Sequence, residues 1–370
     1  MKILFWTEFY LPHLGGIEVL VQDLSAALRA RGHECLILTN RQQPEWPEEE
    51  ILEGIPVHRV AWERALREGP LAVARVVRHV RQLRETFAPQ VEHFFLSGAL
   101  VMLQQMAKPA RPVPQILAVH TLVDRLISGG ESMVRQFHSA QAITSATRLM
   151  QEELQTAFPA SADKVCVISN AIPDSATPPL PLPLTPPVLL FIGRLVIEKG
   201  LDVALQAMKL LMLEFPEITL QVAGDGDQRA SLQALAEALG LSSRVTFCGV
   251  VPRAEVMSWL NRGTIVLVPS RWEEPFGIVN VEAALMQRPV IASRVGGIGE
   301  VVVDGETGLL VAKEDPVQLA AAIRSLLLHP ERLQSMGERA RQRALSVYGF
   351  DSFIASHLRL YESASHSTRD

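Results

Sequence analysis

The sequence predicts an α/β protein of two domains, each with a parallel sheet covered by helices on both faces. Short apolar runs alternate with longer segments of helical period along the whole chain, and this alternation is typical of parallel sheets. A proline-rich stretch interrupts the alternation near the middle. The length of 370 residues is also too great for one ordinary hydrophobic core.

The first domain is expected to span residues 1–175. Its strands are predicted at residues 2–7, 34–39, 57–61, 91–95, 115–119, 142–145 and 165–169. Its helices are predicted to begin near residues 17, 71, 131 and 147. The order of these elements is that of a parallel sheet with crossover helices.

Residues 176–187 form the predicted linker. The surrounding stretch reads SATPPLPLPLTPP and holds six prolines between Pro178 and Pro187. Proline donates no hydrogen bond to a sheet and breaks helices, which favours an extended, fairly stiff connector. A proline-rich site for a partner protein is the alternative.

The second domain is expected to span residues 188–351. Its strands are predicted at residues 188–192, 219–223, 245–248, 265–268 and 290–292. Its helices are predicted to begin near residues 201, 228, 254, 278, 317 and 332. An amphipathic segment at 352–363 then remains after the second domain is complete.

Composition excludes several classes of protein. The chain is 48% hydrophobic and 20% charged with a net charge of −5, so no nucleic-acid partner is expected. The N-terminus does not have the pattern of a signal peptide, and no apolar run reaches the roughly 18 residues of a spanning helix. The three cysteines lie in apolar strand-like runs and are expected to be reduced and buried. We therefore expect a cytoplasmic protein, with contact at a membrane surface left open.

That contact would involve a helix rich in arginine. Arg75, Arg78, Arg81 and Arg84 recur along it, opposite a valine-rich face. A basic amphipathic helix can lie on an anionic membrane, but the outer face of a helix that covers a sheet has the same pattern.

Glycine turns follow two of the predicted strands. Gly15 and Gly16 precede the first helix, and Gly224 and Gly226 lie in the segment AGDGDQR. Glycine lets the backbone approach a ligand closely, and a helix N-terminus favours anions. The pattern is not the G-x-G-x-x-G fingerprint of dinucleotide binding, and connecting turns are the alternative in both places.

Two cations flank the first strand-to-helix loop of the second domain, in FIGRLVIEKG. Arg194 and Lys199 are the residues concerned. A guanidinium group can bind two oxygens of a diphosphate, and an ammonium group adds a point charge. Ordinary surface charge is the alternative.

Two glutamates give the most specific signal. Glu274 and Glu282 are predicted to lie in a loop and on the following helix, separated by Pro-Phe-Gly. Carboxylates accept hydrogen bonds from hydroxyl pairs, which suits a sugar and a ribose. The backbone amides of Phe276, Gly277 and Ile278 can meet an anionic or hydroxylic ligand.

His120 is the best placed histidine, because it follows the predicted strand at residues 115–119. Ligands bind at the carboxyl ends of parallel strands. A structural role is an equal alternative for this residue.

Taken together, these segments resemble the retaining glycosyltransferases of family 4, which have the GT-B fold. The resemblance covers nearly the whole chain: the glycine pair with Glu18, R-x-x-x-x-K, A-G-D-G, E-x7-E with P-F-G, G-G-x-x-E at Gly296 and T-G-L-L-V occur in the family's order. It implies two Rossmann-like domains facing each other across a cleft. It also implies that residues 352–370 form a helix that returns to the first domain.

The resemblance implies roles for the matching residues. Arg194 and Lys199 would hold the donor diphosphate, Glu282 the ribose, and Glu274 the transferred sugar. The amides of Phe276, Gly277 and Ile278 would assist Glu274, and Gly224 would help to bind the donor. Gly16 would bring an amide to the phosphate, and His120 would contact the sugar near its reacting carbon.

The reaction implied is transfer of a hexose-type sugar from a nucleotide diphosphate-sugar to an unidentified acceptor hydroxyl, in glycan, glycolipid or glycoconjugate synthesis. It would proceed with retention of configuration, without metal or cofactor. His120 is followed by Thr121 where many relatives have an acidic residue. A sugar-nucleotide epimerase, a nicotinamide-dependent oxidoreductase and a non-catalytic binding protein of the same fold are the alternatives.

Overall fold

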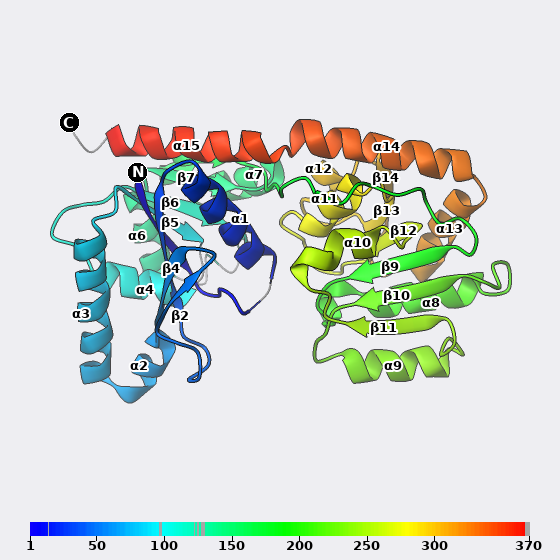
Figure 1. The fold of residues 1–370 in the computed structure, drawn as a ribbon, viewed down its shortest axis with the longest axis horizontal. Coiled ribbons are helices and arrows are strands. Elements are labelled where there is room, and N and C mark those ends of the chain that lie inside the picture. The colour runs from blue at the N-terminus through cyan, green and yellow to red at the C-terminus, as the bar shows by residue number, and fades with distance from the viewer. Residues whose placement is uncertain (14, 96–97, 122, 124–125, 127–129, 367–370) are drawn as a thin grey trace. The chain divides into compact units, whose positions relative to one another are not determined.

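The computed structural model describes residues 1–366 except 14, 96–97, 122, 124–125 and 127–129. The chain divides into two compact units (Figure 1). The first unit contains residues 1–170 and 351–370, and the second contains residues 171–350. Each unit is an α/β domain with its own sheet and hydrophobic core.

The first unit has an eight-stranded sheet in the order β3-β4-β2-β1-β5-β6-β7-β8. All neighbouring strands are parallel except β3 and β4, which are antiparallel. The strands are β1 (Lys2–Thr7), β2 (Glu34–Asn40), β3 (Glu49–Leu52), β4 (Ile55–Val60), β5 (Val91–Phe95), β6 (Gln115–Val119), β7 (Ala142–Ser145) and β8 (Val165–Val167). The helices are α1 (Gly16–Ala30), α2 (Trp62–Glu68), α3 (Pro70–Phe87), α4 (Gly98–Met106), α6 (Gly130–Ser139), α7 (Arg148–Ala157) and α15 (Phe350–His366), with the 3₁₀ helix η1 (Pro159–Lys164).

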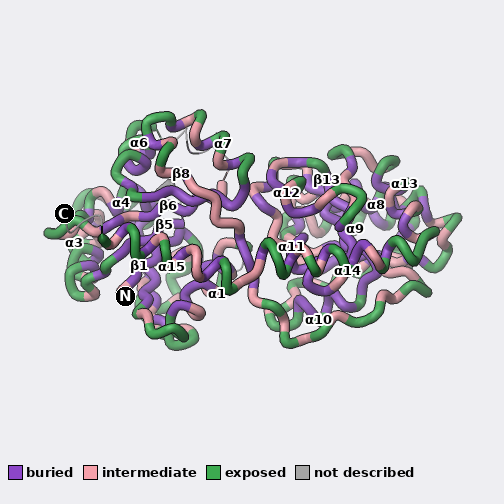
Figure 2. The backbone as a smooth tube through the Cα atoms, turned by 90° about the horizontal axis from the view of Figure 1, so that it is seen from above, coloured by how far each residue is buried: buried purple, intermediate pink, exposed green. Residues whose placement is uncertain are grey.

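Side chains alternate between the two faces of this sheet, as the pleat requires. Leu4 and Trp6 of β1 belong to the hydrophobic core on one face. Phe5, between them, contacts the ring of His93 on the other face, with centroids 5.7 Å apart. Strands β5 and β6 are buried along most of their length (Figure 2). Both faces of the sheet are therefore covered.

Arg84 of α3 does not share the exposed face of the other arginines of this helix. It is buried and binds both oxygens of Glu92 on β5, at 2.7 Å each. The interpretation of Arg84 as part of a basic outer face is therefore wrong. The cause is Glu92, because a buried carboxylate inside the sheet requires a cationic partner.

The second unit has a six-stranded parallel sheet in the order β11-β10-β9-β12-β13-β14. The strands are β9 (Val188–Ile192), β10 (Thr219–Ala223), β11 (Val245–Gly249), β12 (Ile265–Val268), β13 (Val290–Ser293) and β14 (Gly308–Val311). The helices are α8 (Leu201–Leu211), α9 (Arg229–Ala238), α10 (Val256–Leu260), α11 (Ile278–Leu285), α12 (Ile298–Val301), α13 (Pro316–Leu327) and α14 (Pro330–Val347), with the short 3₁₀ helices η2 (Ile197–Lys199) and η3 (Arg253–Glu255). Helix α8 packs against α13, and α11 packs against α14.

The proline-rich segment belongs to the second unit and runs along it without helix or strand. The carbonyl of Leu180 accepts a hydrogen bond from the buried Arg288 at 2.9 Å. Asn261 donates to the carbonyl of Pro178 at 2.9 Å, and Thr264 donates to that of Pro183. The segment has no regular secondary structure and ends in a turn at 184–187, and it is tied to one unit because polar side chains satisfy its carbonyls.

The C-terminal helix α15 belongs to the first unit. Asp351 at its start pairs with Arg31 after α1 at 2.8 Å. Tyr361, further along, is fully buried and hydrogen-bonds to His93 of β5 at 2.8 Å. Among the helices of the described residues, none combines the length and the apolar character that crossing a membrane requires.

Candidate functional site

Glu274 lies in the loop that follows β12, where two other side chains hold its carboxylate. Lys199, at the end of η2, forms an ion pair with Oε1 of Glu274. The hydroxyl of Ser270 donates a hydrogen bond to the same oxygen at 2.8 Å. Glu274 is only 4% exposed, and a carboxylate removed from water needs such partners. The loops after β9 and β12 thus place a cation and an acceptor side by side.

Gly296 supports the backbone of Glu274. Its φ is +49°, and a Cβ at this position would lie 2.3 Å from the carbonyl oxygen of Glu274, so a side chain does not fit. The next residue, Gly297, donates its amide to that carbonyl at 2.8 Å. The glycine pair of the G-G-x-x-E motif therefore fixes the position of the Glu274 loop.

Helix α11 begins immediately after this loop. Its N-cap is Gly277, which has φ 77° and makes no side-chain capping hydrogen bond. The first amides of a helix have no intrahelical partner and carry partial positive charge. Phe276 is buried beside them, and Ile278 is the first helical residue. The helix start can therefore donate hydrogen bonds to an anion or a hydroxyl group.

Glu282 lies one turn further along α11 and is 7% exposed. Its Oε1 forms an ion pair with Nη1 of Arg253, which belongs to η3 after β11. Glu274 and Glu282 thus have different cationic partners, supplied by the loops of two different strands. Both carboxylates are held in defined positions at the same end of the sheet.

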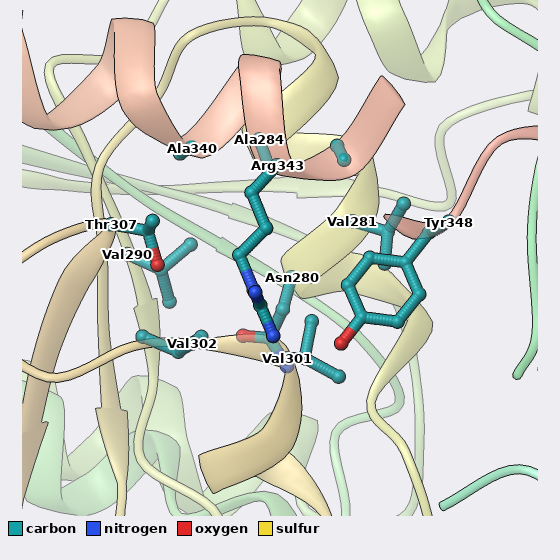
Figure 3. A pocket seen from close by; sticks show the side chains of 11 residues that line it. Asn280, Val281, Ala284, Val290, Val301, Val302, Thr307, Ala340, Arg343 and Tyr348 are labelled. Atoms are coloured by element: carbon teal, nitrogen blue, oxygen red, sulfur yellow. The ribbon is translucent and has the colours of Figure 1, made fainter. Parts of the chain in front are cut away.

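Asn280 lies away from Glu282, because residues two apart on a helix differ by about 200° in direction. It lines a small pocket with Arg343 and Tyr348 (Figure 3). Its Nδ2 donates to the carbonyl of Gly277 at 2.8 Å. Asn280 therefore serves the packing of α11 against α14.

Arg194 and Gly224 follow β9 and β10. Arg194 is exposed. Gly224 has φ +133°, and a Cβ there would lie 1.9 Å from the carbonyl of Gly193. Its amide donates to the carbonyl of Gly249 at 2.7 Å. Gly224 thus brings two loops into contact, and its amide is already used within the protein.

Gly16 begins α1 in the first unit, with Gly15 as the N-cap. The carboxylate of Glu18 folds back over this helix start, since a Cβ on Gly15 would lie 2.4 Å from Oε2 of Glu18. Acidic groups are favourable there because of the helix dipole. The position at which the sequence suggests a bound phosphate is thus next to a carboxylate of the protein.

His120 follows β6, and its ring is stacked on that of Phe95. The centroids are 5.4 Å apart and the planes differ by 6°. Its Nε2 atom is shielded from water and has no hydrogen-bond partner among the residues that the structure describes. Burial, and secondarily the charge of His357, lowers the pKa of His120 to about 4. The imidazole is therefore neutral near pH 7.

Sequence reasoning missed several neighbours of these residues. They are Ser270 and Arg253, which bind the two glutamates, and Trp272, whose ring lies 5.7 Å from Nζ of Lys199. Arg253 carried a usable signal, because it follows a parallel strand as Arg194 does. Phe95 carried none, because an aromatic residue at a strand end is ordinarily part of the core.

One group of side chains in the described part of the chain could share a metal ion. It consists of Glu49, His58 and His79, from β3, β4 and α3. Nδ1 of His58 lies 3.3 Å from Oε1 of Glu49, and the glutamate is exposed. We interpret this contact as a polar contact at the edge strand of the first unit, because burial lowers the pKa of His58 and favours its neutral form.

Comparison with known proteins shows the family of the chain. The family described as "Glycosyltransferase Family 4" matches residues 14–176, and "Glycosyl transferases group 1" matches residues 175–343. The D-inositol 3-phosphate glycosyltransferase of Xylanimonas cellulosilytica is 30% identical, over 95% of this chain and 92% of its own length. The glycogen synthase of Mycobacterium tuberculosis is 29% identical, over 100% and 96%.

Solved structures give the same fold. Sucrose-phosphate synthase from Thermosynechococcus elongatus superposes with a TM-score of 0.85, at 22% identity and 99% coverage of both chains. The Anabaena protein HepE, solved in complex with UDP and glucose, superposes with a TM-score of 0.79, at 21% identity, over 98% of this chain and 100% of its own.

The fold and these matches define the class: the chain is an enzyme of the GT-B fold, a glycosyltransferase of the hexosyltransferase type. It belongs to glycosyltransferase family 4. The alternatives of an epimerase, an oxidoreductase or a binding protein without activity are therefore set aside.

Proposed function

We propose that the enzyme transfers a hexose from a nucleoside diphosphate sugar to an acceptor hydroxyl, with retention of configuration and without a metal ion. The observation that carries the proposal is the cluster of Lys199, Glu274 and Ser270 beside the start of α11. It joins a cation and helix amides, which suit a diphosphate, to a carboxylate, which suits sugar hydroxyls.

In this proposal, each site residue of the second unit binds a different part of the donor. Arg194 and Lys199 bind the diphosphate, and the amides at the start of α11 add donors. Glu274 binds hydroxyls of the transferred sugar, and Glu282, oriented by Arg253, binds the ribose. The Lys199–Glu274 ion pair has to yield part of its hydrogen bonding to the ligand, which links donor binding to a local rearrangement.

The residues of the first unit are proposed to act on the reacting groups. Gly16 offers an amide to the phosphate, and neutral His120 accepts or donates a hydrogen bond at a sugar hydroxyl. Glu18, at the same helix start as Gly16, has to leave room for that phosphate. Its displacement is a testable part of the proposal.

The proposed chemical step uses no nucleophile from the protein. The bond between the anomeric carbon and the phosphate oxygen breaks, and its electron pair goes to the leaving diphosphate. The acceptor oxygen then bonds to the anomeric carbon on the same face, and its proton passes to the departing phosphate oxygen. As the sugar–phosphate bond breaks, positive charge grows on the sugar and negative charge grows on the diphosphate. Preorganised cations and amides stabilise the negative charge.

UDP-glucose is the donor to test first. The HepE structures contain UDP, UDP-glucose, or UDP with glucose, and the relatives include enzymes named glycogen synthase. Release of UDP from UDP-glucose, measured in EDTA with and without soluble glucan or inositol phosphate, tests the proposal. Release stimulated by one acceptor, with the anomeric proton of the product in the donor's configuration by NMR, is the expected result. Isomerised sugar without transfer, or a strict need for added Mg²⁺, would contradict it.

We also propose peripheral contact between α3 and an anionic membrane surface. Arg75 and Arg78 are exposed on this helix, and Leu71 is 81% exposed at its start. Arg78 and Arg81 border a groove lined by apolar side chains of α2, α3 and the end of α4. Cations are attracted to anionic lipid headgroups, and exposed apolar side chains beside them can insert into the membrane surface.

A further inference from the structure

A column of buried rings lies beneath His120 in the first unit. His120 stacks on Phe95, whose centroid is 4.5 Å from that of His93. His93 in turn hydrogen-bonds through Nδ1 to the hydroxyl of Tyr361 at 2.8 Å. His357 lies beside the same ring, 5.5 Å between centroids. The column therefore runs from the candidate catalytic histidine to the C-terminal helix.

The column follows from the spacing of the residues on their elements. His93 and Phe95 are two apart on β5, so both side chains point to one face of the sheet. His357 and Tyr361 are four apart on α15, so both lie on one face of that helix. The helix covers the sheet at this point, and all four side chains are buried there.

Phe95 contacts His120 by ring stacking, which leaves the nitrogens of the imidazole free of hydrogen bonds to Phe95. A stacked ring fixes the plane of the imidazole but forms no hydrogen bond with either of its nitrogens. Nε2 of His120 has no hydrogen-bond partner within the described ranges, so no described side chain would compete with a sugar hydroxyl for it. A polar residue in place of Phe95 would compete for that nitrogen.

We propose that Phe95 is a positioning residue for His120, and that Tyr361 of α15 positions Phe95 by fixing the ring of His93. The proposal rests on the proposed function, because it assumes that His120 contacts the reacting sugar. It makes α15 part of the support of the reaction centre as well as part of the fold of the first unit.

The test compares Phe95→Leu with Phe137→Leu. Phe137 is buried in the same unit and stacked on Phe158, with centroids 4.0 Å apart, and lies on α6. Both changes remove a buried stacked ring, so both lower the midpoint of thermal unfolding. For UDP release from UDP-glucose, we expect Phe95→Leu to lower kcat about tenfold or more, because small misplacements of a catalytic group are costly. The KM for UDP-glucose should change little, and Phe137→Leu should leave kcat near the wild-type value.

Tyr361→Phe provides a milder change, since it removes only the hydroxyl that binds His93. We expect a reduced kcat with an unchanged KM. His120→Ala serves as the reference variant. If its kcat is reduced while Phe95→Leu and Phe137→Leu have equal kcat values, the positioning role of Phe95 is overturned. Wild-type turnover by His120→Ala would instead overturn the role proposed for His120 itself, so the two failures are distinguishable.

Discussion

The ammonium group of Lys199 is paired with the carboxylate of Glu274, although the two residues are 75 positions apart in the chain. The loop after β9 supplies the cation and the loop after β12 supplies the acid. β9 and β12 are neighbours in the sheet, so the topology brings the two loops together. The donor chemistry proposed above depends on this pair.

Lys199→Ala and Glu274→Ala should each remove most of the activity while the protein stays folded. Each removes a group that stabilises the transition state, which costs on the order of 10² in kcat. UDP release and circular dichroism are the measurements. Lys313→Ala is the matched control, because Lys313 pairs with the neighbouring Glu273 at 3.4 Å on the surface. Near wild-type activity in both site variants would refute the site assignment.

Arg253→Ala should weaken UDP binding about tenfold, because a charged hydrogen bond to the buried Glu282 is lost. Isothermal titration calorimetry with UDP measures the dissociation constant. Arg229→Ala is the control, since Arg229 forms a surface pair with Asp225 in the same unit at 3.1 Å. The role assigned to Arg253 fails if the two variants bind UDP equally well.

Acid should destabilise the first unit through its buried histidines. Burial lowers the pKa of His120 and of His357 from 6.5 to about 4, and lowers that of His93 well below 6.5. Between pH 6.5 and 4 the unfolded chain binds more protons than the folded one, so stability falls as pH falls across this window. Each of His120 and His357 contributes up to roughly 3 kcal/mol to this loss.

Urea unfolding of the first unit between pH 4.5 and 7.5 measures this effect, on the order of a few kcal/mol. His357→Gln should flatten the dependence of the unfolding free energy on pH, because one buried imidazole is gone. If the free energy of unfolding of this variant depends on pH as that of the wild type does, the prediction is contradicted. His357 would then take up its proton as readily in the folded protein as in the unfolded chain.

The α3 surface should bind anionic vesicles. Reversing Arg75 and Arg78 together to glutamate should lower binding to phosphatidylglycerol vesicles roughly tenfold or more, since each cation near such a surface contributes about 1 kcal/mol. Vesicle flotation is the measurement, with phosphatidylcholine vesicles and Arg332→Glu as controls. Binding that is equal for wild type and the double variant would exclude this surface as the contact.

Periodicity was sufficient to predict the two α/β domains, because buried parallel strands are continuous apolar runs. It failed for β3, where Glu49–Leu52 is an exposed edge strand with no such run. It also failed for β14, where the short strand Gly308–Val311 follows a tight turn and pairs only with β13 among the strands of the sheet. Short edge strands show little hydrophobic pattern in the sequence, and whether they form depends on pairing with the neighbouring strand.

The candidate site was predictable where the motif itself holds the chemistry. Glu274, Glu282 and Lys199 come from such motifs, and the structure shows each with a specific partner. The partners Arg253 and Phe95 come from distant loops and strands, so their contacts depend on tertiary packing. The carboxylate of Glu18 at the start of α1 also required coordinates, because a side chain that folds back leaves no trace in the sequence.

The measurement that tests the central claim most directly is a thermal-shift panel with UDP, GDP, ADP, CMP and NADH, each with EDTA and with Mg²⁺. A ligand at about 100 times its dissociation constant adds roughly 2.7 kcal/mol of stability, which raises the unfolding midpoint visibly. We expect one nucleoside diphosphate to stabilise the protein in EDTA, and Lys199→Ala to lose that stabilisation. Stabilisation by NADH alone, or by no member of the panel, would contradict the donor site.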